Sequence, residues 1–283
     1  MWWQTRRLYR AMTAVGPLAV TGDAELTNAG DQFLAHRDKL TALDLSPLTR
    51  LTRVGCSFLC GCAGLTSLDL TPLGHVSSVG HAFLADCVGL TALDLTPLAH
   101  LTKEGGSFLG GCGGLTALDL TPLMYLEGVG NGFLGDCTAL TALDLAPLGH
   151  LTSVGDCFLA GCFALTAVDF TAFFHLTSVG SSFLAGCANL RTLDLTPFAQ
   201  LASAGISFFH DCVGLTALDL TPLTHLTRMG GQFLAGCREL TAVDLTITFR
   251  VATSSGNKGI PVHSSHRSSV QRRRKPLKSL LAV

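Results

Sequence analysis

The chain has 283 residues, 48% of them hydrophobic and only 14% charged, and its formal net charge is −1. No apolar run reaches the roughly 18 residues that a membrane-spanning helix requires, which excludes such a helix. The charge is unevenly distributed: residues 14–250 hold all 20 acidic residues but only nine of the 19 basic ones, a net charge of −11. An acidic central region therefore lies between two basic ends.

Residues 1–14 match nothing that follows. Leu8, Met12 and Val15 recur at the spacing of one helical face, which predicts a short capping helix, with a disordered start as the alternative. Because basic residues precede the apolar run Ala11–Val20, this region also resembles a weak signal peptide. However, Gly16-Pro17 interrupts that apolar run, and it aligns better as a degenerate repeat.

The segment Leu65–Leu70, L-T-S-L-D-L, returns every 25 residues. Its aspartates are Asp44, Asp69, Asp94, Asp119, Asp144, Asp169, Asp194, Asp219 and Asp244. A fixed period of 20–30 residues carrying L-x-x-L-x-L predicts a leucine-rich-repeat solenoid, an α/β horseshoe. We expect one degenerate and nine regular turns over residues 15–254, with a parallel sheet on the concave face and one-turn helices on the convex side. Leu18-Ala19-Val20 would be the degenerate strand.

Each turn alternates inward and outward side chains. Leu65, Leu68 and Leu70 should point into the core from a short strand, and Asp69 should point outward. Thr71-Pro72 should end the strand, because proline offers no N–H to a sheet ladder.

The second half of each turn contains a repeated glycine, such as Gly80, and then the pattern F-L-x-x-C. We expect Gly80 at a place where a Cβ would be obstructed. Phe83 and Cys87 stand four residues apart, which predicts a one-turn helical segment with both on its inner face. Stacking would produce one phenylalanine column and one column of eight cysteines. We interpret the latter as small buried apolar residues rather than disulfides.

Beyond Leu245 the pattern fades. Residues 255–283 are rich in Ser, Arg and Lys and predict a disordered basic tail. The run Arg272–Lys275 resembles a nuclear-import or nucleic-acid patch, but it lacks interleaved aromatics and the solenoid is acidic, so we favour a solvated tail and expect no nucleic-acid partner. Folding of the tail back onto the aspartates is a related possibility. An open last edge could also stack on further repeats or another chain.

The segment Val79–Cys87, V-G-H-A-F-L-A-D-C, is similar to the I-G-x-x-A-F-x-x-C segment of BspA-like leucine-rich repeats. The resemblance covers about 26–250. It departs from that family in its 25-residue period, where 23 is usual, and in reading L-D-L where the family often has I-x-I-P. The resemblance implies a curved solenoid and, in many relatives, a surface protein used in adhesion or partner binding. It implies no catalytic residue.

The aspartate column is the strongest chemical feature. Carboxylates about 5 Å apart repel by about 0.8 kcal/mol per neighbouring pair in water. One interpretation is that solvation and threonine hydroxyls, such as those of Thr66 and Thr71, offset this repulsion. The other is that the column attracts a basic peptide, a cationic ligand or divalent cations. The residues predicted to bind a partner are Asp69, Asp94, Asp119, Asp144, Asp169 and Asp194.

Other chemical groupings are weaker. Cys56, Cys60 and His81, with Asp86 nearby, have spacing that would allow metal binding, but only in two turns, and burial of Cys60 is the alternative. Recurrent histidines at His75, His100, His150, His175 and His225 predict exposed loop residues, with pH-sensitive or metal contacts as the alternative. No Ser/His/Asp or Cys/His set is singled out from the repeats, and no phosphate-binding loop occurs. We therefore expect no enzyme activity, metal or cofactor.

The sequence favours a non-catalytic interaction or adhesion scaffold that binds a macromolecular partner through the concave acidic sheet. We expect this partner to be a protein, and the acidic sheet favours one with basic character. The alternative is a structural or surface-coat repeat protein, a surface antigen, without a discrete ligand. Localisation stays open between the cytoplasm and the cell surface, because no convincing signal peptide is present and the ends lack the cysteines that usually close secreted repeats.

Overall fold

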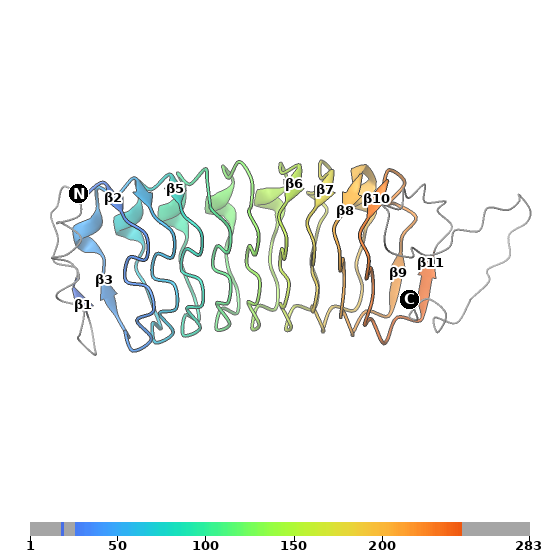
Figure 1. The fold of residues 1–283 in the computed structure, drawn as a ribbon, viewed down its shortest axis with the longest axis horizontal. Helices are drawn as coiled ribbons and strands as arrows, with labels where there is room; N and C mark the ends of the chain where they lie inside the picture. The colour runs from blue at the N-terminus through green and yellow to red at the C-terminus, as the bar shows by residue number, and fades with distance from the viewer. Residues whose placement is uncertain (1–17, 20–25, 245–283) are drawn as a thin grey trace, which may run out of the picture.

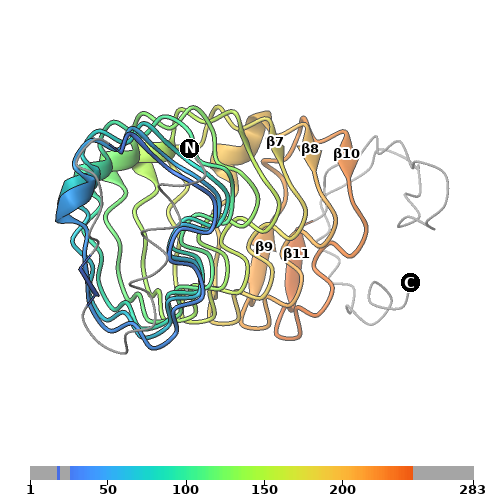
Figure 2. The same cartoon turned by 60° about the vertical axis from the view of Figure 1, so that its left-hand side comes forward.

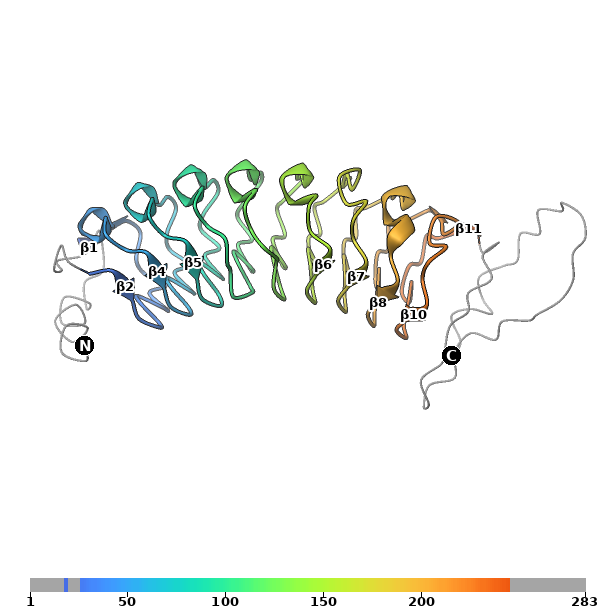
Figure 3. The same cartoon turned by 90° about the horizontal axis from the view of Figure 1, so that it is seen from above.

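The computed structural model describes residues 18–19 and 26–244. The turns stack in a single row (Figures 1 and 2). Seen from above, the row is bowed, and its one-turn helices lie along the wider, convex rim (Figure 3). This is the parallel-stranded solenoid that the 25-residue period predicts. Within the described part of the chain, no helix is long and apolar enough to cross a membrane.

Parallel strands form at two places in each turn. Strands at the L-D-L position are β1 (Leu18–Ala19), β3 (Leu43–Asp44), β9 (Ala217–Asp219) and β11 (Ala242–Asp244). Strands at the later position, typically Ser-Val, are β2 (Asn28–Ala29), β4 (Arg53–Val54), β5 (Ser78–Val79), β6 (Ser153–Val154), β7 (Ser178–Val179), β8 (Ser203–Ala204) and β10 (Arg228–Met229). The sheets are ordered β1-β3, β2-β4-β5, β6-β7-β8-β10 and β9-β11. The second position, which we had not predicted as a strand, is thus the more regular ladder.

The predicted degenerate strand pairs with the first regular turn. Leu18 pairs with Leu43 and Ala19 with Asp44, both at an offset of 25 residues. The predicted capping helix at 1–14, the last part of the solenoid to residue 254 and the tail at 255–283 lie outside the described residues.

One-turn helices follow the L-D-L segment. They are the 3₁₀ helices η1 (Ser46–Leu48), η2 (Thr71–Leu73), η3 (Thr96–Leu98), η4 (Thr121–Leu123), η5 (Ala146–Leu148) and η6 (Thr196–Gln200). Each begins with Pro in its first two positions, where a fixed φ suits a helix and the missing N–H is not needed. In η2, the N–H of Leu73 donates to the carbonyl of Leu70 at 2.8 Å. Proline therefore starts a helix here in addition to ending the strand.

The helical segment predicted for F-L-x-x-C is wrong. Residues Ala82, Leu84 and Asp86 have φ of 60°, 53° and 58°, so the backbone alternates between left- and right-handed conformations. The N–H of Leu84 donates to Phe58 of the preceding turn at 2.9 Å, and that of Ala82 donates to Gly106 of the following turn at 2.8 Å. Bonds between turns replace the bonds that a helix would make. They offset the cost of the left-handed residues, about 1–2 kcal/mol each.

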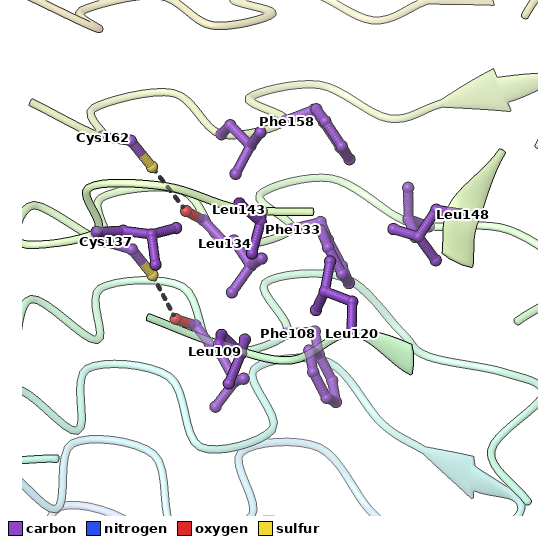
Figure 4. Packing of buried hydrophobic residues seen from close by; sticks show 14 of the residues in the cluster. Phe108, Leu109, Leu120, Phe133, Leu134, Cys137, Leu143, Leu148, Phe158 and Cys162 are labelled. Atoms are coloured by element: carbon purple, nitrogen blue, oxygen red, sulfur yellow. Dashed lines mark hydrogen bonds between the residues drawn. The ribbon is translucent and has the colours of Figure 1, made fainter. Parts of the chain in front are cut away.

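The phenylalanine column is confirmed. Successive rings from Phe33 to Phe233 are stacked with centroids 5.2–5.8 Å apart and interplanar angles of 7–15°. Phe108, Phe133 and Phe158 are fully buried and run beside a leucine column (Figure 4). A single turn buries none of this surface alone, so its neighbours provide the stability.

The expected obstruction at Gly80 is also confirmed, and its cause is close approach between turns. A Cβ on Gly80 would lie 2.5 Å from the carbonyl carbon of Gly55, and comparable clashes occur at Gly105, Gly155 and Gly205. Glycine at this place lets the backbones of successive turns come into contact.

Candidate partner-binding surface

The aspartates of the L-D-L segments form a row that we call the aspartate strip, residues Asp44, Asp69, Asp94, Asp119, Asp144, Asp169, Asp194 and Asp219. Each is exposed. Asp144 pairs with Asp169 across neighbouring turns, and Asp219 pairs with Asp244 in the same way. The 25-residue period therefore places the carboxyl-bearing residues directly in register, one turn apart.

Every carboxylate of the strip has the same backbone partner. Oδ1 of Asp119 accepts the N–H of Thr121 at 2.8 Å, and the other seven accept the N–H two residues later at the same distance. This contact is an Asx turn, and in six of the eight turns it leads the chain into a one-turn helix. The aspartate thus has a structural task in its own turn, which explains its presence in every turn without a ligand.

Threonine hydroxyls add to this effect. The pKa of Asp69 is lowered by the hydroxyl of Thr71 and then by its N–H, and Asp94, Asp119 and Asp194 have lowered pKa values for the same reasons. The hydrogen bonds that offset repulsion therefore come from the residue two places later, as expected for Thr71. Thr66 is not among the causes. These carboxylates stay ionised well below neutral pH, so the strip is a fixed negative surface.

The column beside the strip is nearly uniform. The residue three places before each aspartate is an exposed threonine in all but one of the regular turns, and Arg191 is the exception. The hydroxyl of Thr216 donates to the carbonyl of Arg191 at 3.3 Å, and that of Thr141 donates to Thr116 at 3.4 Å. This part of the surface differs little from turn to turn.

The histidine row lies on exposed loops, as expected. The ring of His150 contacts the carbonyl of Leu126 through Nε2 at 2.7 Å, and that of His225 contacts Ala199 through Nδ1 at 2.8 Å. These rings bind the preceding turn of their own chain. Tyr125, which replaces histidine in one turn, is 62% exposed.

The cysteine column is buried and its thiols are free, as expected from the sequence. Its members are Cys62, Cys87, Cys112, Cys137, Cys162, Cys187, Cys212 and Cys237. Each thiol donates to a carbonyl of the preceding turn, as Cys137 does to Leu109 and Cys162 to Leu134, both at 3.3 Å (Figure 4). Burial raises the pKa of Cys112 to about 12, which suppresses the thiolate. These groups pack in the core and link successive turns through their hydrogen bonds.

The possible metal site is not assembled. Cys60 is buried with Ala82 and Ala85, while Cys56 and His81 are exposed. Among the residues that the structure describes, no three His, Cys, Asp or Glu side chains are grouped to hold a metal ion.

Sequence reasoning overlooked Glu104. It stands where other turns place a buried valine, as in K-E-G-G in place of S-V-G-H. Oε2 of Glu104 accepts the N–H of Gly106 at 2.6 Å, and Oε1 accepts the N–H of Gly130. A charged residue in an apolar column was the available signal, because such a group must find hydrogen bonds when buried.

Part of the sequence matches a known repeat family. Residues 128–255 match the model of the BspA type leucine rich repeat region, in six copies. No curated protein matched the sequence. Among solved structures, the leucine-rich repeat protein of T. pallidum aligns at 19% identity over 62% of this chain and 77% of its own, with a TM-score of 0.47.

Two further structures show the same kind of likeness. The functional domain of InlJ from Listeria monocytogenes, which includes a cysteine ladder, aligns at 23% identity over 75% of this chain and 50% of its own, with a TM-score of 0.37. A leucine-rich repeat protein from Bacteroides ovatus ATCC 8483 aligns at 18% identity over 83% and 74%, with a TM-score of 0.36. The repeat match and the stacked parallel turns agree: this chain is a parallel-stranded solenoid whose residues 128–255 are similar to BspA type leucine-rich repeats.

Proposed function

We propose that this chain is a non-catalytic scaffold that binds a basic protein partner along the aspartate strip. Leucine-rich repeats commonly serve interaction, and the region around the strip carries a net charge of −11. The proposal rests chiefly on one observation: exposed carboxylates stand in register one turn apart, each oriented by the same backbone N–H.

That arrangement favours an extended partner. Each carboxylate is already oriented by its turn, so ordering it for binding costs little additional conformational entropy. The lowered pKa of Asp119 keeps its carboxylate charged over the physiological range. Because the turns are alike, the strip recognises regularly spaced positive charges more than one particular shape. A lysine- and arginine-rich segment lying along several turns fits these conditions.

The test uses a fluorescent lysine- and arginine-rich peptide and two charge-matched variants. The first variant replaces Asp119, Asp144 and Asp169 with Asn and removes three charges from the strip. The second replaces Asp86, Asp136 and Asp211 with Asn. These are three exposed aspartates of the F-L-x-x-C segments, so the net charge changes by the same amount. Fluorescence anisotropy at about 50 and 200 mM salt then reports the Kd of each protein.

We expect the strip variant to bind about tenfold more weakly at low salt, because exposed charge pairs contribute on the order of 0.5 kcal/mol each. The control variant should bind nearly as the parent chain does. Equal weakening in both variants would mean that net charge alone attracts the peptide. Binding by neither the parent chain nor the control would favour the alternative, a structural or surface-coat protein without a discrete ligand.

A further inference from the structure

In most turns, a regular backbone hydrogen bond links the segment at the Ser-Val position to the preceding turn. The N–H of the repeated glycine donates to the carbonyl of the core residue one turn earlier, as Gly80 does to Val54 at 2.9 Å and Gly155 to Val129 at 3.2 Å. Six turns share this bond: those of Gly55, Gly80, Gly155, Gly180, Gly205 and Gly230. It is one of several repeated hydrogen bonds between the backbones of successive turns.

Within the described residues between β4 and β10, this bond is missing at two consecutive turns, those of Gly105 and Gly130. The strands before the interruption end with the pair Ser78–Lys103, and those after it begin with the pair Val129–Val154. At the interruption, the N–H of Gly130 donates to the side chain of Glu104 where other glycines donate to a backbone carbonyl. A carboxylate has therefore been inserted between two turns in place of the direct backbone bond.

The surroundings of Glu104 compensate its charge only in part. A shallow hollow of about 350 Å³ lies beside it, lined by Thr102, Lys103, Glu127, Val129 and Ser153 among others. Lys103 is 3.7 Å from Glu127, and both side chains are exposed. The other titratable group that acts on Glu104 is His81 of the preceding turn, whose Nδ1 is 3.2 Å from the carbonyl oxygen of Gly105.

Burial raises the pKa of Glu104, and this outweighs the two N–H donors and His81, which lower it. A raised pKa means that the folded contact between these two turns favours the protonated form of Glu104. The stability that Glu104 contributes to the contact between these two turns is therefore fully present below its ordinary pKa and is lost as pH rises through the raised pKa.

We propose that the junction between the turns of Glu104 and Val129, which we call the seam, is a point of local opening in the solenoid, and that the proton on Glu104 controls it. Local opening occurs where backbone bonds are few and accessible to water. At the seam a direct backbone bond is replaced by contacts to an ionisable side chain beside an open hollow. The blocks of turns on either side of the seam are more regular. They would therefore separate from each other more easily than the turns within each block separate.

Hydrogen exchange of the full chain tests this proposal. The protection factor of the Gly130 amide is compared with that of Gly155, which makes the regular bond in the next turn, between about pH 4 and 8. We expect Gly130 to be less protected by about tenfold or more. The ratio of the Gly130 protection factor to the Gly155 protection factor should fall further as pH rises. Equal protection of the two amides at every pH would overturn the proposal.

Three variants separate the carboxylate from its neighbours. Glu104→Val restores the residue type of the column and should raise protection of Gly130 toward that of Gly155. Glu104→Gln keeps the shape but cannot titrate, so the pH dependence of the ratio should vanish even if Glu104→Val fails to fold. Glu127→Gln, the control, should retain it. A pH dependence that survives in Glu104→Gln, or disappears in Glu127→Gln, would contradict the assignment.

Discussion

Asp144 and Asp169 are paired directly across two neighbouring turns, and each accepts the N–H of the residue two places later in its own turn. This contact sets the direction of each carboxylate, and at Asp144 it also precedes a one-turn helix, η5. The strip is therefore a consequence of how the repeat folds. Its use in binding would draw on charges that the fold already holds in place.

The first prediction concerns the aromatic column. Phe133→Ala removes a fully buried ring stacked between two others, so it should lower the free energy of unfolding by about 3–5 kcal/mol. Phe163→Ala is the matched control, because its ring is 50% exposed. Denaturant unfolding followed by circular dichroism measures both. Similar losses for the two variants would show that stacking in the column is not what stabilises the solenoid.

A second prediction tests close contact between turns. Gly80→Ala would place a methyl group against the backbone of Gly55 and Cys56, which should cost about 1–3 kcal/mol. Gly30 occupies the same place in the first regular turn, where a Cβ would meet nothing within 4 Å among the residues that the structure describes. Gly30→Ala should therefore change the thermal midpoint little. The expectation fails if Gly80→Ala is as stable as Gly30→Ala.

A third prediction concerns acid stability. Because the folded pKa of Asp119 is lowered, its contribution to stability is present above its ordinary pKa and is lost as pH falls through the folded value. Thr121→Val removes the hydroxyl and keeps the backbone N–H, so the pKa of Asp119 should rise part of the way back. Carboxyl chemical shifts in an NMR titration measure this, and an unchanged pKa would rule out the hydroxyl as its main cause.

A fourth prediction follows from thiol burial. Cys56 and Cys157 are exposed, whereas the eight thiols of the column are buried, and the pKa of Cys162, like that of Cys212, is raised to about 12. Brief alkylation of the folded chain near pH 8, read by mass spectrometry, should modify only the two exposed residues. Denaturant should make all 11 cysteines reactive. Rapid native labelling of Cys112 or Cys137 would contradict the burial of the column.

Much of the architecture could be predicted from the sequence because stacking makes every turn obey one pattern. The 25-residue spacing was enough to align Leu18 with Leu43, and the L-x-x-L-D-L pattern was enough to separate buried leucines from exposed aspartates. The helix predicted at Phe83–Cys87 failed for a physical reason. Bonds between turns stabilise left-handed residues such as Leu84, and local spacing carries no information about such bonds.

The candidate surface was predictable in part. The positions of the aspartates followed from the period, whereas their Asx-turn contacts depend on the helix that follows, which we had not placed there. The repeat period carries no information about Glu104, because this residue departs from its column. In a solenoid, neighbouring turns must rearrange around a residue that departs from its column, so such a residue marks a place where the repeat structure changes.

The most direct test of the central claim is to locate a bound lysine- and arginine-rich peptide by NMR amide shifts on the full chain. Binding along the aspartate strip predicts changes concentrated at Thr121, Ala146 and Thr171, whose amides donate to strip carboxylates. Amides near Asp86 and Asp136, in the F-L-x-x-C segments, should move little. Shifts concentrated at those segments, or absent while the peptide is bound, would contradict the account.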